Sequence, residues 1–244
     1  MTRRRWIADE VSGNRAALVG EQAVHLARVL RVRVGQEFEI ACDGRVRLGR
    51  VATISPERVE FDLGAEVNSA ALPVVHLLLA IFKFDRMEWA IEKATELGVT
   101  SILPFAAQRS EKNFCAAADK RVERWRRIAR EAAQQSRRDT PPDILALVKL
   151  ADAARFEADT RVALAPEGAP LLALFARSGR TSQSHIAPGV TTALAVGPEG
   201  GWTEAELRFF RDSGWTLASL GPTILRAETA AIAALAVVTQ ALTA

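Results

Sequence analysis

The chain contains few residues that could form disulfides or bind a metal ion. Its 244 residues include two cysteines, Cys42 and Cys115, which form no C-x-x-C pair. A disulfide framework and a thiolate zinc site are therefore not expected. The three histidines, His25, His76 and His185, are far apart and show no HExxH spacing. The sequence thus predicts two reduced thiols without a role, and an activity that needs no metal.

Several common motifs and long apolar runs are also missing. The chain has neither a G-x-S-x-G elbow nor a G-x-x-x-x-G-K-[ST] loop, the usual signals of serine hydrolases and P-loop nucleotidases. No apolar run approaches the roughly 18 residues of a membrane span. The basic N-terminus reaches Asp9 and Glu10 where an export signal needs an apolar stretch. These absences predict a cytoplasmic protein without a membrane partner.

The charge is unevenly placed, although the formal net charge is only +3. Eight basic and three acidic residues lie between Asp119 and Arg138, and Arg28, Arg31 and Arg33 form a second cluster. Arginine makes bidentate contacts with phosphate and stacks on bases. A solvated helix face explains a single run of this kind. Several arginine clusters in one chain favour a nucleic-acid partner.

The first 70 residues have the pattern of a small β-barrel. Polar and apolar residues alternate over 45–51 and 58–63, which predicts strands with one buried face. The dipeptide Asp43-Gly44 predicts a hairpin turn. One short helix is expected over 21–29.

Residues 73–244 have the pattern of an α/β domain. The near-continuous apolar run over 74–81 is typical of a strand buried on both faces of a parallel sheet. Further strands are predicted over 101–104, 144–148, 162–165, 192–196 and 216–220. Helices are predicted over 86–97, 118–136, 203–212 and 227–242, and a polar loop over 178–188. Alternation of strands and helices predicts a layered α/β fold.

Two glycine-proline loops follow apolar strands of this domain. Gly197–Gly201 has three glycines and one proline in five residues, and Gly221-Pro222 interrupts the chain again about twenty residues later. Such segments cannot continue a strand or begin a regular helix, and their backbone can approach a ligand closely. The sequence therefore predicts one ligand pocket at the carboxyl ends of neighbouring strands.

Four motifs occur in this order: Lys93–Val99, Glu131–Arg138, Gly197–Gly201 and Leu220–Ala230. Together they resemble the bacterial family that methylates N3 of a uridine in 16S ribosomal RNA, within the SPOUT superfamily. The segment His25–Arg31 is similar to part of that family's N-terminal PUA-like barrel. The resemblance extends over nearly the whole chain.

The resemblance implies a PUA-like RNA-binding β-barrel over 1–70 and a SPOUT α/β domain over 73–244 with a deep trefoil knot. It implies S-adenosylmethionine as methyl donor and a homodimer with the active site near the subunit interface. The implied substrate is 16S ribosomal RNA, within the small ribosomal subunit. The expected donor-binding residues are Leu194, Val196, Gly197, Pro198, Glu199, Gly200, Leu220, Gly221, Ile224, Leu225 and Thr229.

Arg226 and Glu199 are the catalytic candidates. Loss of the uridine N3 proton places negative charge on neighbouring oxygens, which Arg226 could stabilise. Alternatively, Arg226 forms a salt bridge with Glu228 or Glu199. Glu199 holds the donor's ribose or amino group, acts as a base, or caps the next helix. The RNA-binding candidates are Arg28, Arg31, Lys83, Arg86, Arg109, Arg137 and Arg138.

Two residues depart from the family pattern. Phe84 replaces the glycine of Lys-Gly-Asp/Glu-Lys/Arg, and Ala227 replaces the threonine of Arg-Thr-Glu-Thr-Ala. One alternative function is a catalytically inactive RNA-binding module with a SPOUT-like dimerisation domain. The intact Gly197–Gly201 loop argues against that alternative. An enzyme that binds another nucleotide is disfavoured because no G-x-G-x-x-G follows the first apolar strand.

Overall fold

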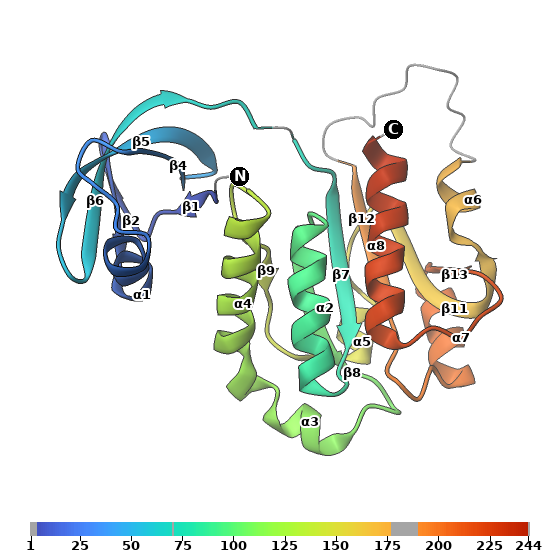
Figure 1. The fold of residues 1–244 in the computed structure, drawn as a ribbon. Coiled ribbons are helices and arrows are strands. Elements are labelled where there is room, and N and C mark those ends of the chain that lie inside the picture. Colours follow the sequence, from blue (N-terminus) through green and yellow to red (C-terminus); the bar gives the residue numbers. More distant parts are fainter. Residues whose placement is uncertain (1–3, 70, 177–189, 244) are drawn as a thin grey trace. The chain divides into compact units, whose positions relative to one another are not determined.

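The computed structural model describes residues 4–69, 71–176 and 190–243 (Figure 1). The chain divides into two compact units, Met1–Ala71 with Arg130–Pro141, and Leu72–Ala129 with Pro142–Ala244. The loop predicted over 178–188 lies outside the described residues. Among the residues that are described, no helix combines the length and apolar character needed to cross a membrane.

The first unit contains a curled six-stranded sheet, drawn in blue and cyan in Figure 1. Its strands are β1 (Trp6–Ile7), β2 (Glu10–Ser12), β3 (Arg15–Val19), β4 (Glu37–Cys42), β5 (Arg45–Ile54) and β6 (Arg58–Glu66). They follow the order β1-β4-β5-β6-β3-β2, and only the short β1 pairs in parallel among these described strands. Alternate side chains enter a core that includes Trp6, Leu18, Ile40 and Phe61. The predicted barrel is thus confirmed as a curled half-barrel.

Local sequence signals of this unit are also confirmed. Asp43 and Gly44 both have positive φ, 51° and 72°, as a type I′ hairpin turn requires. The predicted short helix forms as α1 (Gly20–Val24) followed by a π-helical turn, η1 (His25–Val29). Single π-helical turns are uncommon and occur often at functional sites.

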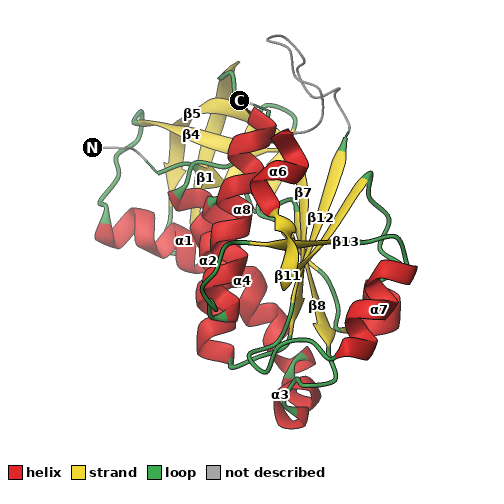
Figure 2. Cartoon of the chain, turned by 90° about the vertical axis from the view of Figure 1, so that its right-hand side faces the viewer, coloured by secondary structure: helices red, strands yellow, loops and turns green. Residues whose placement is uncertain are grey.

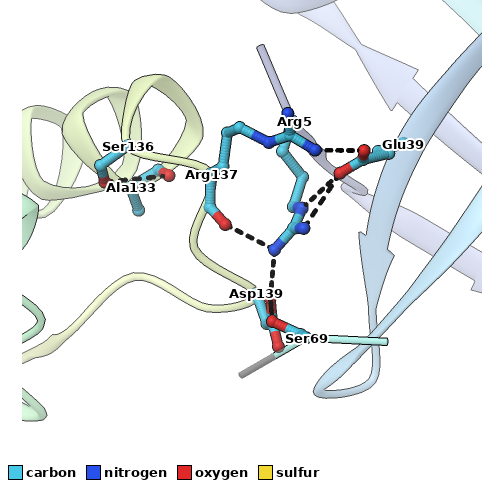
Figure 3. Close-up of polar contacts among 7 residues, drawn as sticks. All are labelled: Arg5, Glu39, Ser69, Ala133, Ser136, Arg137 and Asp139. Carbon is cyan, nitrogen blue, oxygen red and sulfur yellow. Dashed lines mark hydrogen bonds and ion pairs between the residues drawn. The ribbon is translucent and has the colours of Figure 1, made fainter. Parts of the chain in front are cut away.

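An ionic cluster fixes the chain after α4 (Val122–Gln135) to the first unit (Figure 3). The buried guanidinium of Arg5 donates from Nε to Glu39 at 3.0 Å, and from Nη1 to Asp139. Arg137 donates to the other oxygen of Glu39, and its carbonyl accepts from Arg5. Ser69 donates to Asp139 at 2.9 Å. Residues 130–141 therefore belong to the first unit. The predicted division into 1–70 and 73–244 places them in the second.

Glu39→Gln is expected to lower the free energy of unfolding by about 2 kcal/mol at pH 7. Burial alone raises the pKa of Glu39, but hydrogen bonds from Arg5 and Arg137 outweigh it and lower the pKa overall. The ionised carboxylate therefore stabilises the native state above the unfolded pKa of about 4.3, and this contribution is lost as the pH falls through the lower native pKa.

Urea unfolding of both proteins at several pH values measures this difference. The two stabilities should begin to converge as the pH falls below about 4.3 and should meet below the lower native pKa of Glu39. Glu66→Gln is the matched control, because its ion pair with Arg45 is exposed on both sides. A constant difference across the pH range would contradict the role given to the Glu39 carboxylate.

The second unit is built on a parallel sheet, shown in yellow in Figure 2. Its strands are β7 (Val74–Ala80), β8 (Ser101–Ala106), β9 (Asp143–Ile144), β10 (Val148–Lys149), β11 (Thr160–Pro170), β12 (Thr191–Val196) and β13 (Thr216–Ser219). The order is β10-β8-β7-β12-β11-β13, and β9 also pairs with β8. All these pairs are parallel, so the carboxyl ends of neighbouring strands meet at one edge.

Helices cover both faces of this sheet (Figure 2). They are α2 (Phe84–Glu96), α3 (Lys112–Ala117), η2 (Asp119–Arg121), α4, α5 (Leu150–Ala153), α6 (Leu171–Ala176), α7 (Glu204–Asp212) and α8 (Ala227–Thr243). Leu77 and Leu79 of β7 share one core with α2 and α8, whereas Leu78 and Ala80 share the other with α5 and α7. Burial on both faces explains the apolar run over 74–81 and confirms its prediction. The helix predicted over 118–136 begins only at Val122.

Strand β11 comes unusually close to β13. Its pairing with β13 shifts in register between Leu164 and Ala169. Within this irregular segment, a Cβ atom on Gly168 would lie 2.4 Å from the backbone nitrogen of Ala218. The two backbones are therefore in direct contact, and only glycine fits at this position.

Candidate functional site

A pocket of about 160 Å³ lies at the carboxyl ends of β12 and β13, beside the register shift in β11. Its lining comes from these parts of the three strands, from the two loops that the sequence singled out, and from the first turn of α8. The lining residues are Leu164, Ala165, Pro166, Val196, Gly197, Pro198, Glu199, Gly201, Trp202, Ala218, Ser219, Leu220, Gly221, Thr223, Ile224, Leu225, Ala227 and Ala230. Most are apolar or expose backbone groups, which suits a flat apolar group with polar edges.

Trp202 connects the loop after β12 to the middle of β11. Its Nε1 donates to the carbonyl oxygen of Leu164 at 2.7 Å, and its ring stacks on Phe105 with a 10° interplanar angle. A Cβ atom on Gly197 would lie 2.9 Å from Cε2 of Trp202. Glycine at 197 therefore lets the loop pass against the indole, which holds two walls of the pocket together.

The same loop is held from outside by the segment after β8. Arg109 donates from Nη1 to the carbonyl oxygens of Gly200 and Trp202, at 2.9 and 3.2 Å. Glu206 accepts from the backbone N–H of Gln108 at 2.7 Å. Glu206 also completes a capping box with Thr203 at the start of α7, which confirms the helix predicted over 203–212. Contacts with Arg109 and Gln108 thus hold the loop in one conformation.

The loop after β13 is more open. Gly221 has φ of 123°, a conformation that favours glycine, and it exchanges hydrogen bonds with the hydroxyl of Ser219. Ile224 is 93% exposed at the pocket rim. This loop leads directly into α8, so it connects the pocket to the N-terminus of a long helix.

Carboxylates and arginines surround one side of the pocket. Arg86 donates from Nη1 to Oε1 of Glu199, and its Nε lies 3.8 Å from Oε1 of Glu228. Glu228 is 3% exposed, and its Oε2 has no hydrogen-bond partner among the described residues. Arg226 is exposed and forms no ion pair within the described part of the chain. The salt bridge considered for Arg226 is thus made by Arg86 instead.

The structure brings together most residues predicted to bind a donor. Eight of the eleven line the pocket: Val196, Gly197, Pro198, Glu199, Leu220, Gly221, Ile224 and Leu225. Leu194 is fully buried in the core beneath, because its side chain points to a packed face of β12. Gly200 and Thr229 lie outside the lining. Ala227, one of the departures from the family pattern, is a lining residue.

The sequence reasoning missed the third wall of the pocket. Leu164, Ala165 and Pro166 come from β11, at its register shift, and Trp202 comes from the loop after β12. A signal was present, because Pro166-Glu167-Gly168 within β11 repeats the Pro198-Glu199-Gly200 pattern that follows β12. A search for that repeat would have found the third strand.

The RNA-binding candidates differ in the contacts that their side chains make within the protein. Arg28, Arg31 and Lys83 are exposed and form no ion pair among the described residues. Arg86 and Arg109 bind the pocket loop, as described above. Arg137 pairs with Glu39, and burial lowers the pKa of Arg138 to about 10, which leaves it charged at neutral pH.

Comparison with known proteins identifies two matched regions. Residues 69–239 match the family model of an RNA methyltransferase domain, and residues 18–64 match that of an RNA methyltransferase PUA domain. A relative from Bacillus subtilis (strain 168), named ribosomal RNA small subunit methyltransferase E, is 33% identical over 91% of this chain and 88% of its own. A relative of the same name from Mycobacterium tuberculosis is 34% identical over 93% of this chain and 87% of its own.

Solved structures are similar over almost the entire chain. Ribosomal RNA small subunit methyltransferase E from Neisseria gonorrhoeae, bound to S-adenosyl methionine, has a TM-score of 0.82 and 28% identity, covering 98% of this chain and 97% of that chain. A methyltransferase from Legionella pneumophila in complex with the same cofactor has a TM-score of 0.77 and 28% identity, with the same coverage.

Proposed function

This chain belongs to the RNA methyltransferase family that includes ribosomal RNA small subunit methyltransferase E, and from that premise we propose that it methylates N3 of a uridine in 16S ribosomal RNA. The methyl donor is S-adenosylmethionine. The observation that carries this function is the pocket lined by β11, β12, β13 and the loops after β12 and β13, in a chain similar over 98% of its length to an enzyme bound to that donor.

The pocket residues fit this donor. Backbone groups of Gly197–Gly201 and Leu220–Leu225 can bind the polar edges of adenine and ribose, while Val196 and Leu225 contact the base. Gly221 leaves open space for this close approach, whereas Gly197 makes room for Trp202. When bound, the donor supplies an electrophilic methyl group on a sulfonium centre.

Gly197→Ala is expected to weaken binding of S-adenosylmethionine roughly tenfold. The added Cβ would collide with Trp202, whose indole cannot move without losing its bond to Leu164. The loop must then shift away from its position in the pocket. Titration calorimetry measures the affinity. Gly13→Ala, in the first unit with no heavy atom within 4 Å of the new Cβ, should leave it unchanged. Unaltered donor affinity in Gly197→Ala would contradict the proposed cradle.

The chemistry assigned to this chain is proton loss and charge stabilisation at the uridine. The N3 proton leaves before or during attack, and Arg226 stabilises the negative charge on the neighbouring oxygens. Glu199, held at the rim by Arg86, either takes that proton or binds the donor's ribose or amino group. Methyl transfer from a sulfonium needs no metal.

RNA binding is assigned to the PUA-like half-barrel and to exposed basic residues. Arg28, Arg31 and Lys83 have guanidinium or ammonium groups available for phosphate. Contacts within the protein occupy Arg86, Arg109 and Arg137, so they support the RNA surface less directly. Binding through such residues should depend strongly on salt concentration.

Three further features belong to this proposal. A trefoil knot in the second unit is proposed from the family to which the chain belongs. A homodimer with its active site near the interface is supported by Ile224, an apolar side chain that a second copy would cover. Small ribosomal subunits in the cytoplasm are the proposed substrate, which follows from the family's RNA target.

Nucleoside analysis of 16S ribosomal RNA from cells lacking the protein tests the function. N3-methyluridine should be absent there and should return on expression of the intact gene. Titration with S-adenosylmethionine tests the alternative of an inactive RNA-binding module, because such a module should give no binding heat. Unchanged N3-methyluridine in the deletion strain would reject the proposed reaction.

A further inference from the structure

We infer that Arg86 is a positioning residue, which links the rim carboxylate of Glu199 to the buried carboxylate of Glu228. In this way it holds the loop after β12 and the first turn of α8 at a fixed separation. The inference rests on the proposed function, because both segments line the pocket assigned to the methyl donor.

The geometry places Arg86 between two segments that are distant in sequence. Its Nη1 donates to Glu199 in the β12 loop, and its Nε lies 3.8 Å from Glu228 on α8. Ala227 and Ala230, in the same first turn of α8 as Glu228, line the pocket. One guanidinium therefore contacts a residue in each of two segments that line the pocket.

Aromatic packing at the start of α2 holds the backbone next to Arg86 in place. Phe84, two residues earlier, packs against Phe114 and Trp125 with ring centroids 5.1 and 6.0 Å apart. The guanidinium of Arg121 covers the Phe84 ring at 4.9 Å. Phe84 thus restricts a position where a glycine would leave the backbone free.

The ion pair with Arg86 stabilises the fold because the carboxylate of Glu228 is buried. Its side chain is 4% exposed, and Arg86 is its ion-pair partner among the described residues. A buried carboxylate is costly unless a cation or hydrogen bonds compensate it. Its Oε2 has no such bond in the described part of the chain. Removing Arg86 thus leaves Glu228 uncompensated and releases Glu199.

These two consequences can be separated by substitution. Arg86→Ala should lower the melting temperature by roughly 5 °C and weaken S-adenosylmethionine binding roughly tenfold. Adding Glu228→Gln removes the buried charge while keeping its shape, so the melting temperature should recover. Donor affinity should stay low in this double variant, because Glu199 is still released.

Arg124→Ala is the matched control, since it also breaks an arginine–glutamate pair, with Glu88 at 2.6 Å, away from the pocket. Its donor affinity should equal that of the wild type. Amide hydrogen exchange without donor supplies a second readout. Exchange in residues 199–202 should be faster in Arg86→Ala and in the double variant, and unchanged in Arg124→Ala.

Full recovery of donor affinity in the double variant would overturn the inference, because Arg86 would then act only through stability. Unchanged loop exchange in the double variant would overturn it as well. If Arg86→Ala does not fold, the double variant and Arg86→Lys provide the same comparison. Failure of the wild type to bind the donor rejects the proposed function instead, while the exchange experiment still reports on the link.

Discussion

Gly168→Ala is expected to prevent stable folding of the second unit. The new Cβ would lie 2.4 Å from the nitrogen of Ala218 and 2.5 Å from its Cα and from the carbonyl carbon of Leu217. All three are backbone atoms, so no rotamer change can relieve the overlap. Strands β11 and β13 would have to separate, which breaks their pairing beyond the register shift. We expect a loss of more than about 3 kcal/mol.

Urea unfolding followed by tryptophan fluorescence measures this loss. Gly201→Ala is the matched control, because its Cβ would meet no heavy atom within 4 Å although φ is +68°. It should cost about 1 kcal/mol from backbone strain alone. If both variants unfold at the same urea concentration, the close approach of β11 and β13 at Gly168 does not require glycine at that position.

Arg226→Ala is expected to lower kcat by roughly 10²- to 10³-fold while S-adenosylmethionine affinity changes less than about twofold. Arg226 is exposed, and it lies between two pocket residues, Leu225 and Ala227. No carboxylate of the described residues pairs with it, so its charge is available to the substrate. Its contribution should therefore arise in the transition state.

Steady-state methylation of 16S ribosomal RNA gives kcat, and calorimetry gives donor affinity. Arg226→Lys should be intermediate, because an ammonium keeps the charge without the planar fork. Arg208→Ala, an exposed arginine on α7 outside the pocket lining, should behave as wild type. Equal losses of turnover and donor affinity would assign Arg226 to donor binding.

Local features of the pocket could be predicted because their causes lie within a few residues. The apolar stretches of β7 and β12 indicate burial on both faces, which the two cores confirm. Glycines at 197 and 221 indicate close backbone approach, and the helix predicted over 203–212 begins with a capping box of Thr203 and Glu206. The order of these signals was enough to place the pocket at strand ends.

Other features could not be predicted because they depend on partners far away in the sequence. The pocket wall formed by β11 requires that β11 lie between β12 and β13 in the sheet. The order of the strands along the chain does not reveal this arrangement. Leu194 was placed in the pocket, whereas the pleat of β12 turns it into the core. Arg137 was assigned to RNA, yet its guanidinium binds Glu39, 98 residues away.

By itself, the sequence determined the two kinds of local architecture, the glycine loops and the family. Hydrophobic period, turn residues and helix caps act over short range, so they can be read directly from neighbouring residues. Tertiary structure alone decided which charges meet: Arg86 with Glu199 and Glu228, and Arg5 with Glu39 and Asp139. Such pairs depend on how distant segments pack, because their partners are far apart in the sequence and come within contact distance only in the folded chain.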